Sequence, residues 1–358
     1  MQQLPKQRGR LEGVDLMRGA ACLAVVLFHS LEAYQASSLT PLLAVIRTAT
    51  SHGWLGVHVF FALSGWCIAE RLAAAITRGE KARHFLFDRL LRIFPTYWAA
   101  LILLLVMRLA AQPFNHTPIV ANLPSGASGW IADLFLINPY LGAPATLMVS
   151  WSLVYELGFY GLAAVALALA KQGISACKLI GSGLLLCGWS VASLAVPGAL
   201  VLGLWPGFFC GVIAWWSTRH RSATRRAIGL SFFALFALLS ALGTPGLSGP
   251  APTAALVTGC ILFATASLGN ETMAAFRPIR ALLALGASSY SVYLVHVTIM
   301  SPFQNLVGRY IPPSSTSFIL VWLGAIVLGI LGGVIFYHQV ELRCERLRKR
   351  MMAVRFAR

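Results

Sequence analysis

Long apolar runs, separated by short polar and basic stretches, dominate the hydrophobic pattern of this chain. Most of the runs approach the ~20 residues that a helix needs to cross a bilayer. Turn residues rich in proline and glycine fall between them. We predict about ten membrane-spanning helices, over residues 17–35, 55–77, 95–111, 147–170, 176–196, 199–217, 227–243, 251–269, 281–302 and 316–338. The pattern therefore predicts an all-α integral membrane protein, with one transmembrane domain over residues 1–358.

The distribution of basic residues predicts which side of the membrane the termini and loops face. If the N-terminus is cytosolic, ten spans place 25 of the 28 Lys and Arg residues on the cytosolic side, and only Arg47, Arg108 and Arg309 outside. An excess of Lys and Arg in cytoplasmic loops is typical of membrane proteins. We therefore predict that both termini are cytosolic, with an N-terminal segment over 1–13 and a basic tail over 339–358.

Composition supports the membrane assignment and limits the classes of partner that the chain is expected to bind. Of the 358 residues, 58% are hydrophobic and 11% are charged, whereas a soluble domain carries about 25% charged residues. The net charge of +17 falls between apolar runs, which indicates lipid headgroups and cytosolic phosphates rather than nucleic acid. The seven cysteines form no CxxC pair, so we predict neither a disulfide framework nor a metal site.

The first apolar run carries ionisable side chains. Arg18 and His29 are eleven residues apart, which on an α-helix is three turns plus ~20° and a rise of ~16 Å, so they share one face with Asp15 nearby. Ionisable groups inside a span are costly and point to function. A buried neutral His29 could act as a general base. Alternatively, His29 bonds a neighbouring helix, Arg18 reaches headgroups and Asp15 pairs with Arg18 on the helix surface.

Two further stretches suggest ligand contacts, one on the cytosolic side and one in mid-membrane. Arg89 and Arg92, three residues apart and followed by Pro95 and Tyr97, suit bidentate binding of phosphate. The alternative is ordinary positive-inside charge. Ser64 lies in mid-membrane within the run 53–66, where a small residue favours close helix packing, with ligand contact as the second interpretation.

Glu156 lies about two turns inside a span that is entered from the external side, at the depth expected for His29. A carboxylate bonded to the histidine would fix its tautomer and stabilise the imidazolium. Alternatively, Glu156 is protonated and bonds a tyrosine. Later in the chain, Ser289, Tyr293 and His296 share one helix face. This face could contact substrate or form a polar seam between helices.

Together these stretches resemble the membrane acyltransferase-3 family, whose members modify bacterial surface glycans and similar acceptors. The resemblance covers most of the chain, from Val14 to about Glu341, and rests on five blocks in the family's order. These blocks are Asp15-Leu16-Met17-Arg18-Gly19 with His29, Gly56–Gly65, Arg89-Leu90-Leu91-Arg92 with Pro95, Trp151-Ser152-Leu153 with Glu156, and Ser289–His296.

The resemblance implies a multi-pass protein of the bacterial cytoplasmic (inner) membrane. It implies an acyl-CoA donor, usually acetyl-CoA, no tightly bound cofactor, and a hydroxyl acceptor on a surface or exported glycan, a glycolipid or a similar molecule. His29 would be the catalytic base, Arg18 would bind the donor or stabilise charge, and Glu156 or Asp15 would orient His29. We expect donor contacts from Arg89, Arg92, Ser64 and Tyr97, and acceptor contacts from Trp151, Tyr155, Tyr293 and His296. The oligomeric state stays open.

Two other functions fit the same pattern. A proton-coupled transporter could use the buried His29 and Glu156 as a relay, although the sequence contains no inverted repeat. A membrane scaffold could use the polar groups only to join helices.

Overall fold

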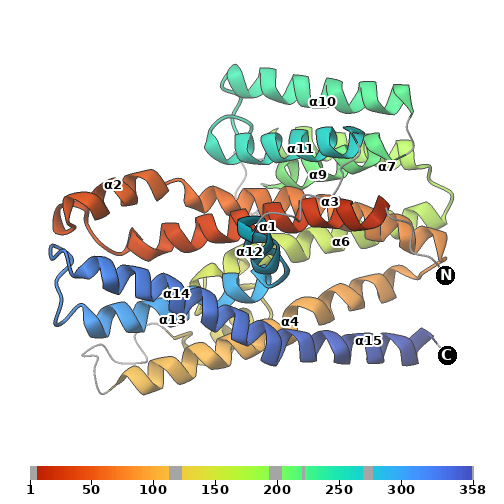
Figure 1. The fold of residues 1–358 in the computed structure, drawn as a ribbon. Helices are drawn as coiled ribbons and strands as arrows, with labels where there is room; N and C mark the ends of the chain where they lie inside the picture. The colour runs from red at the N-terminus through yellow and green to blue at the C-terminus, as the bar shows by residue number, and fades with distance from the viewer. Residues whose placement is uncertain (1–5, 113–122, 193–203, 220–221, 269–276, 357–358) are drawn as a thin grey trace. The chain divides into compact units, whose positions relative to one another are not determined.

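The computed structural model describes residues 6–112, 123–192, 204–219, 222–268 and 277–356, which form helices and no strands (Figure 1). The α-helices are α1 (Lys6–Glu32), α2 (Pro41–Thr50), α3 (Gly56–Thr77), α4 (Ala82–Ala111), α5 (Gly126–Leu134), α6 (Trp151–Lys171), α7 (Ala176–Ala192), α9 (Trp205–Thr218), α10 (Ala223–Ala241), α11 (Pro250–Leu268), α12 (Arg277–Ala287), α13 (Ser289–Val307), α14 (Phe318–Phe336) and α15 (Leu342–Phe356). Short 3₁₀ turns cover Ala36–Ser38, Gly53–Leu55, Asn138–Tyr140 and Met148–Ser150, and a π-helical turn covers Tyr337–Glu341. The all-α prediction is confirmed for the described residues.

The described residues contain seven helices long and apolar enough to cross a membrane, or eight if a bent pair counts as one span. This is fewer than the predicted ten. The predicted spans 176–196 and 199–217 correspond to α7 and α9, with 17 and 14 described residues, both short of the ~20 that a span needs. Parts of both predicted spans lie outside the described residues.

Two predicted span boundaries differ from the structure. Pro95 lies inside the 30-residue helix α4 rather than at its start, because neighbouring groups in a membrane helix can take over the hydrogen bond that proline removes. The predicted span 281–302 is divided between α12 and α13, which meet at an angle of 85°.

The chain divides into two compact units, each described here by itself. Unit 1 comprises residues 1–18, 55–90 and 152–283. In this unit α9 packs against α3, α7, α10 and α11. Helices α3 and α9 approach closely because glycines face the partner backbone: a Cβ on Gly65 would lie 1.9 Å from the Phe208 carbonyl oxygen, and one on Gly211 would lie 1.8 Å from that of Ala62. Small residues in the predicted span 55–77 therefore do permit close packing.

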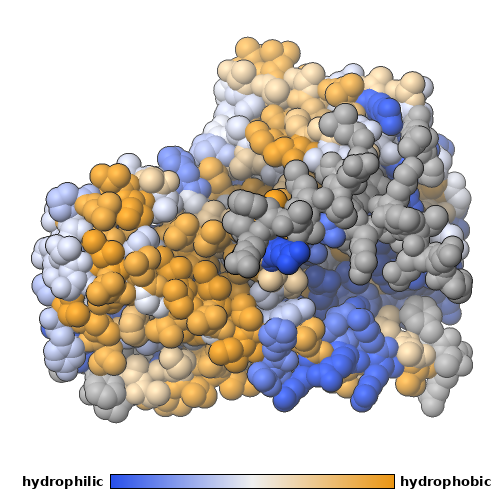
Figure 2. Space-filling view, in the orientation of Figure 1, coloured by the Kyte–Doolittle hydropathy of each residue, from blue (hydrophilic) through white to orange (hydrophobic). Residues whose placement is uncertain are grey.

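Unit 2 comprises residues 19–54, 91–151 and 284–358, and α13 and α14 pack side by side in it. Large apolar side chains of α14, including Leu320, Val327 and Ile335, face outward. Figure 2 shows this orange apolar surface and, further along the chain, the blue basic side chains of α15. The contrast is that expected of a membrane-facing helix followed by a basic segment.

The predicted helix end near residue 338 is wrong. Instead, α14 continues through the π-helical turn Tyr337–Glu341 into α15, so most of the basic tail is helical. The polar interval 112–146 contains a short helix, α5. Residues 113–122 of that interval lie outside the described residues.

Candidate functional site

Helix α1 is continuous from Lys6 to Glu32 and carries Asp15, Arg18 and His29. In unit 1, Arg18 Nη1 lies 3.9 Å from Asp15 Oδ1, and its Nη2 donates to Cys67 Sγ at 3.7 Å. Asp15 is therefore a partner of Arg18. Because fourteen residues of α-helix separate Asp15 from His29 by ~21 Å, Asp15 does not orient His29, contrary to one of our two predictions.

The carboxylate that contacts His29 in unit 2 belongs to Glu32. Its Oε2 lies 2.7 Å from His29 Nδ1, one helical turn further along α1. Because a carboxylate only accepts hydrogen bonds, Nδ1 is the protonated nitrogen and Nε2 carries the lone pair of the neutral ring. Sequence reasoning missed Glu32, although its spacing of three residues from His29 was a sufficient signal.

A second histidine, His296 on α13, accompanies His29. The two ring centroids are 5.3 Å apart, and His296 is fully buried. Its Nδ1 lies 3.0 Å from the Val292 carbonyl oxygen and 2.9 Å from that of Tyr293, so this nitrogen is the donor. Its Nε2 is buried and has no partner. We call His29, Glu32 and His296 the histidine cluster.

Several bonds between α1 and α13–α14 fix the position of the histidine cluster within unit 2. Trp322 Nε1 donates to Ser30 Oγ, and Gln304 Nε2 donates to the Ser30 carbonyl oxygen, both at 2.8 Å. Cys22 Sγ contacts the Ser289 carbonyl oxygen at 3.9 Å. Because Ser30 directly follows His29, these bonds restrain the backbone that carries the histidine.

Helix α13 makes polar contacts with other segments of unit 2, through Tyr293 of its predicted polar face and through Ser291 on the other side of the helix. Tyr293 donates its hydroxyl to the Val149 carbonyl oxygen at 2.9 Å. Ser291 Oγ donates to Glu341 Oε2 at 2.5 Å, and Glu341 is also within electrostatic reach of Arg92. Glu341, in the π-helical turn, is a half-buried carboxylate that sequence reasoning did not assign to the site.

In unit 1, Glu156 on α6 accepts hydrogen bonds from two hydroxyl groups. Ser64 Oγ donates to Glu156 Oε1 at 3.1 Å, and the Tyr160 hydroxyl donates to the same oxygen. This matches the alternative in which Glu156 bonds a tyrosine. Tyr155 on the same helix packs its ring 6.3 Å from that of Phe61, and Trp151 is exposed in unit 2.

Arg89, one of the two arginines predicted to bind phosphate, lies among other charged side chains in unit 1. Arg89 Nη2 lies 2.6 Å from Asp88 Oδ2, and Arg71 Nη2 lies 2.8 Å from Glu80 Oε2 and 3.7 Å from Asp88 Oδ2. We call these four residues of unit 1 the ionic cluster. Arg89 Nε and Arg71 Nη1 are buried without an acceptor. These four residues oppose two cations to two carboxylates, and the exposed Arg78 lies 3.9 Å from Glu80 Oε2 as a further cation. The two N–H groups without an acceptor remain available to an anion.

Tyr97 makes a structural contact within unit 2. It is fully buried, and its hydroxyl donates to the Asp133 carbonyl oxygen at 2.9 Å, so it connects α4 to α5 in unit 2. Asp133 Oδ1 in turn accepts from the Thr146 backbone N–H at 3.1 Å. These bonds give Tyr97 a structural role, and its contact with the acyl donor stays a prediction.

Neither disulfides nor a cluster of metal ligands was predicted. Each of the seven cysteines is a free thiol. Within the described ranges, no three His, Cys, Asp or Glu side chains gather closely enough to hold a metal ion.

The chain is similar to known acyltransferases over most of its length. The sequence profile of a family described as "Acyltransferase domain" matches residues 11–338. The exopolysaccharide production protein ExoZ of Rhizobium meliloti is 27% identical, over 83% of this chain and 92% of ExoZ. The peptidoglycan O-acetyltransferase OatA of Listeria monocytogenes is 23% identical over 88% of this chain, which spans about half of OatA (54%).

No solved structure matches the chain. The family match covers far more than half of its residues and favours an enzyme over the transporter and scaffold alternatives. The chain is a multi-pass membrane acyltransferase and belongs to the acyltransferase-3 family.

Proposed function

We propose that this protein is an O-acyltransferase that moves an acyl group, in the first instance acetyl, from a cytosolic acyl-CoA to a hydroxyl group of a surface or exported polysaccharide or glycolipid. The names of the two relatives, one an O-acetyltransferase and one an exopolysaccharide production protein, support this substrate class. The observation that carries the proposal is the hydrogen bond of 2.7 Å between His29 and Glu32, beside His296.

In the proposed reaction, the acceptor hydroxyl oxygen attacks the carbonyl carbon of the thioester. A C–O bond forms and the C–S bond breaks. His29 Nε2 takes the hydroxyl proton as general base and passes it to the departing CoA sulfur. Glu32 orients the ring and stabilises the imidazolium, as a carboxylate does for the histidine of a catalytic triad. The unpartnered Nε2 of His296 is a neutral acceptor close to that transient positive charge.

The donor side of the proposal rests on Arg89 and Arg92. Arg89 is oriented by Asp88 and retains a buried N–H without an acceptor, which suits a phosphate oxygen of CoA. Arg18, with a charge only loosely paired to Asp15 at 3.9 Å, would contribute to donor binding. The distribution of Lys and Arg supports donor entry from the cytosol, with the membrane of residence being the bacterial cytoplasmic membrane.

Replacement of His29 tests the proposal. With His29→Ala and His29→Gln we expect acyl transfer to fall by about 10²- to 10⁴-fold, the usual contribution of a general base. The measurement is transfer of label from acetyl-CoA to cell-envelope glycan in membranes that contain equal amounts of each variant. The glycan is then analysed by mass spectrometry for loss of one acetyl mass per modified site.

His52→Ala is the matched control, because His52 is an exposed histidine of unit 2 whose Nδ1 lies 3.2 Å from the hydroxyl of the neighbouring Ser51. Full glycan acylation by His29→Ala at normal protein levels would show that His29 is not the base. Labelling of protein, or of a lipid that carries no sugar, instead of a glycan or glycolipid by the wild type would show that the acceptor class is wrong.

A further inference from the structure

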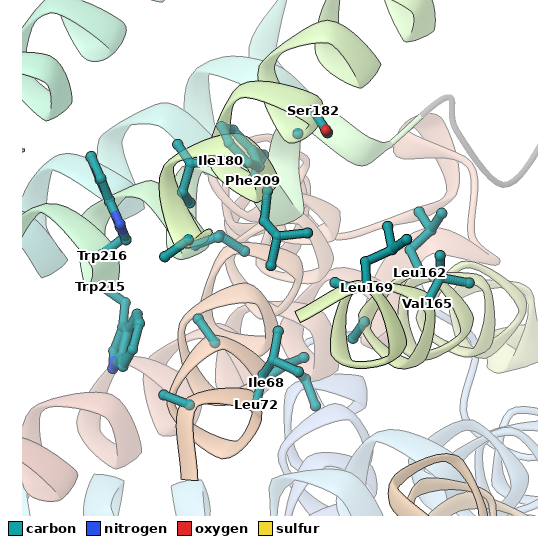
Figure 3. Close-up of a pocket in the computed structure, with 18 of the residues that line it drawn as sticks. Ile68, Leu72, Leu162, Val165, Leu169, Ile180, Ser182, Phe209, Trp215 and Trp216 are labelled. Carbon is teal, nitrogen blue, oxygen red and sulfur yellow. The ribbon is translucent and has the colours of Figure 1, made fainter. Parts of the chain in front are cut away.

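A cavity of about 400 Å³ lies among the helices of unit 1, within the size range of small-molecule pockets. Figure 3 shows side chains converging on it from α3, α6, α7 and α9, among them Ile68, Leu162, Ile180 and Phe209. Almost all of the lining is aliphatic or aromatic. None of the residues proposed above for acyl transfer lines the cavity, so it is a separate site.

One part of this lining carries N–H donors that lack acceptors. Trp215 and Trp216 are 9% and 6% exposed, and both indole Nε1 atoms are buried without a hydrogen-bond partner. Indole nitrogens usually find an acceptor when they are buried, and leaving a buried donor unpaired is unfavourable. The two indole N–H groups are therefore available to the acceptor oxygens of a ligand at this end of the cavity.

Positive charge lies at the same end. The guanidinium carbon of Arg225, which also lines the cavity, lies 5.3 Å from the centre of the Trp216 ring, and that of Arg219 lies 5.5 Å from the Trp215 ring. Glu70 lies 3.8 Å from Arg219 and offsets its charge. Among the described residues, no carboxylate pairs with Arg225. The N-terminus of α10, which begins at Ala223, adds the partial positive charge of a helix dipole.

An apolar cavity with cationic and N–H donors at one end is complementary to an amphiphile with a hydrocarbon chain and an anionic head. Two of the lining helices, α3 and α6, belong to segments long and apolar enough to span the membrane. The basic stretch 219–226 is on the predicted cytosolic side. Basic pockets between helices on that side bind the headgroups of anionic lipids. We propose that this cavity binds one acyl chain of an anionic phospholipid from the cytosolic leaflet, with its phosphate at Arg225 and the tryptophan pair.

Native mass spectrometry of the full chain in detergent tests this proposal, with dioleoyl phosphatidylglycerol as the probe. We expect one retained phosphatidylglycerol on the wild type, and weaker retention of dioleoyl phosphatidylcholine. Arg225→Gln should weaken phosphatidylglycerol binding about fivefold, the effect of one basic residue near an anionic surface. Ile180→Trp should abolish retention, because the larger side chain fills the cavity.

Matched variants separate this site from general lipid association. Arg83→Gln removes an exposed arginine outside the cavity, and Leu185→Trp enlarges a side chain of α7 that is 77% exposed. Both should bind phosphatidylglycerol as the wild type does. Trp216→Phe keeps the ring but removes its N–H, and should weaken binding severalfold even if Ile180→Trp fails to fold.

Three results would overturn the proposal. Equal phosphatidylglycerol retention by Arg225→Gln, Trp216→Phe and the wild type would exclude the assigned site. Displacement of the lipid by glycerol 3-phosphate alone would show a phosphate site that needs no acyl chain. Stoichiometric displacement by palmitoyl-CoA at lower concentration than phosphatidylglycerol would assign the cavity to the chain of a long acyl donor.

Discussion

The ionic cluster of unit 1 and the histidine cluster of unit 2 both bury polar side chains among apolar helices, but they satisfy them in opposite ways. In the ionic cluster, Arg71 and Arg89 lie against Glu80 and Asp88, so opposite charges balance. In the histidine cluster, one carboxylate contacts His29, while Nε2 of His296 is buried with no partner.

The two clusters meet different chemical requirements, one for holding buried cations and one for transferring a proton. A buried cation needs a nearby carboxylate to remain charged at acceptable cost, so Asp88 and Glu80 are what allow Arg71 and Arg89 to remain buried. A general base needs the reverse, an accessible lone pair on a nitrogen that can change its protonation state. Substitutions in the ionic cluster should therefore reduce stability, and substitutions in the histidine cluster should reduce rate.

The largest expected effect comes from Asp88→Asn. The change leaves Arg89 without its carboxylate, and removal of one partner of a buried ion pair costs about 3–5 kcal/mol. Thermal unfolding of the purified protein in detergent should show a large fall in Tm. Glu345→Gln is the control, because Glu345 pairs with Arg348 but its side chain is 29% exposed, and such pairs contribute about 1 kcal/mol or less. Similar losses of Tm in both variants would show that the buried ion pair contributes no more to stability than the partly exposed one.

A smaller effect, on rate rather than stability, is expected for His296→Phe. The somewhat larger phenyl ring keeps an aromatic group in place but removes the acceptor beside His29, and a disturbed alignment costs about 10- to 100-fold in kcat. KM for acetyl-CoA and Tm should stay near the wild-type values. The control is His338→Phe, an exposed histidine in the π-helical turn. If His296→Phe lowered Tm and left kcat unchanged, His296 would belong to a structural seam only.

The smallest effect is expected for Glu32→Gln. Its amide oxygen can still accept from His29 Nδ1, but the negative charge that stabilises the imidazolium is lost. Because the Glu32 side chain is 49% exposed, we expect about a tenfold fall in kcat, much less than for a fully buried triad carboxylate. Glu32→Asp retains the charge and should recover part of the rate. If Glu32→Gln were as active as the wild type, a group other than Glu32 would orient His29.

The apolar pattern was sufficient to predict an all-helical membrane protein and the approximate position of most helices. It was not sufficient for their ends, because a single apolar run cannot reveal whether the helix bends. The run 281–302 contains the 85° bend between α12 and α13, and the helix beginning at Ala82 passes through Pro95. These differences depend on which neighbouring groups accept the backbone hydrogen bonds.

The sequence by itself determined the membrane class, the family motifs and the residues that could perform chemistry, because composition and spacing are local properties of the chain. Only the tertiary structure decided which of those residues meet. His296 on α13 lies beside His29 on α1, Ser291 donates to Glu341, and Tyr293 donates to the Val149 carbonyl oxygen. Such contacts depend on how the helices pack, because a buried polar group needs a hydrogen-bond partner and packing decides which side chain or carbonyl group lies next to it.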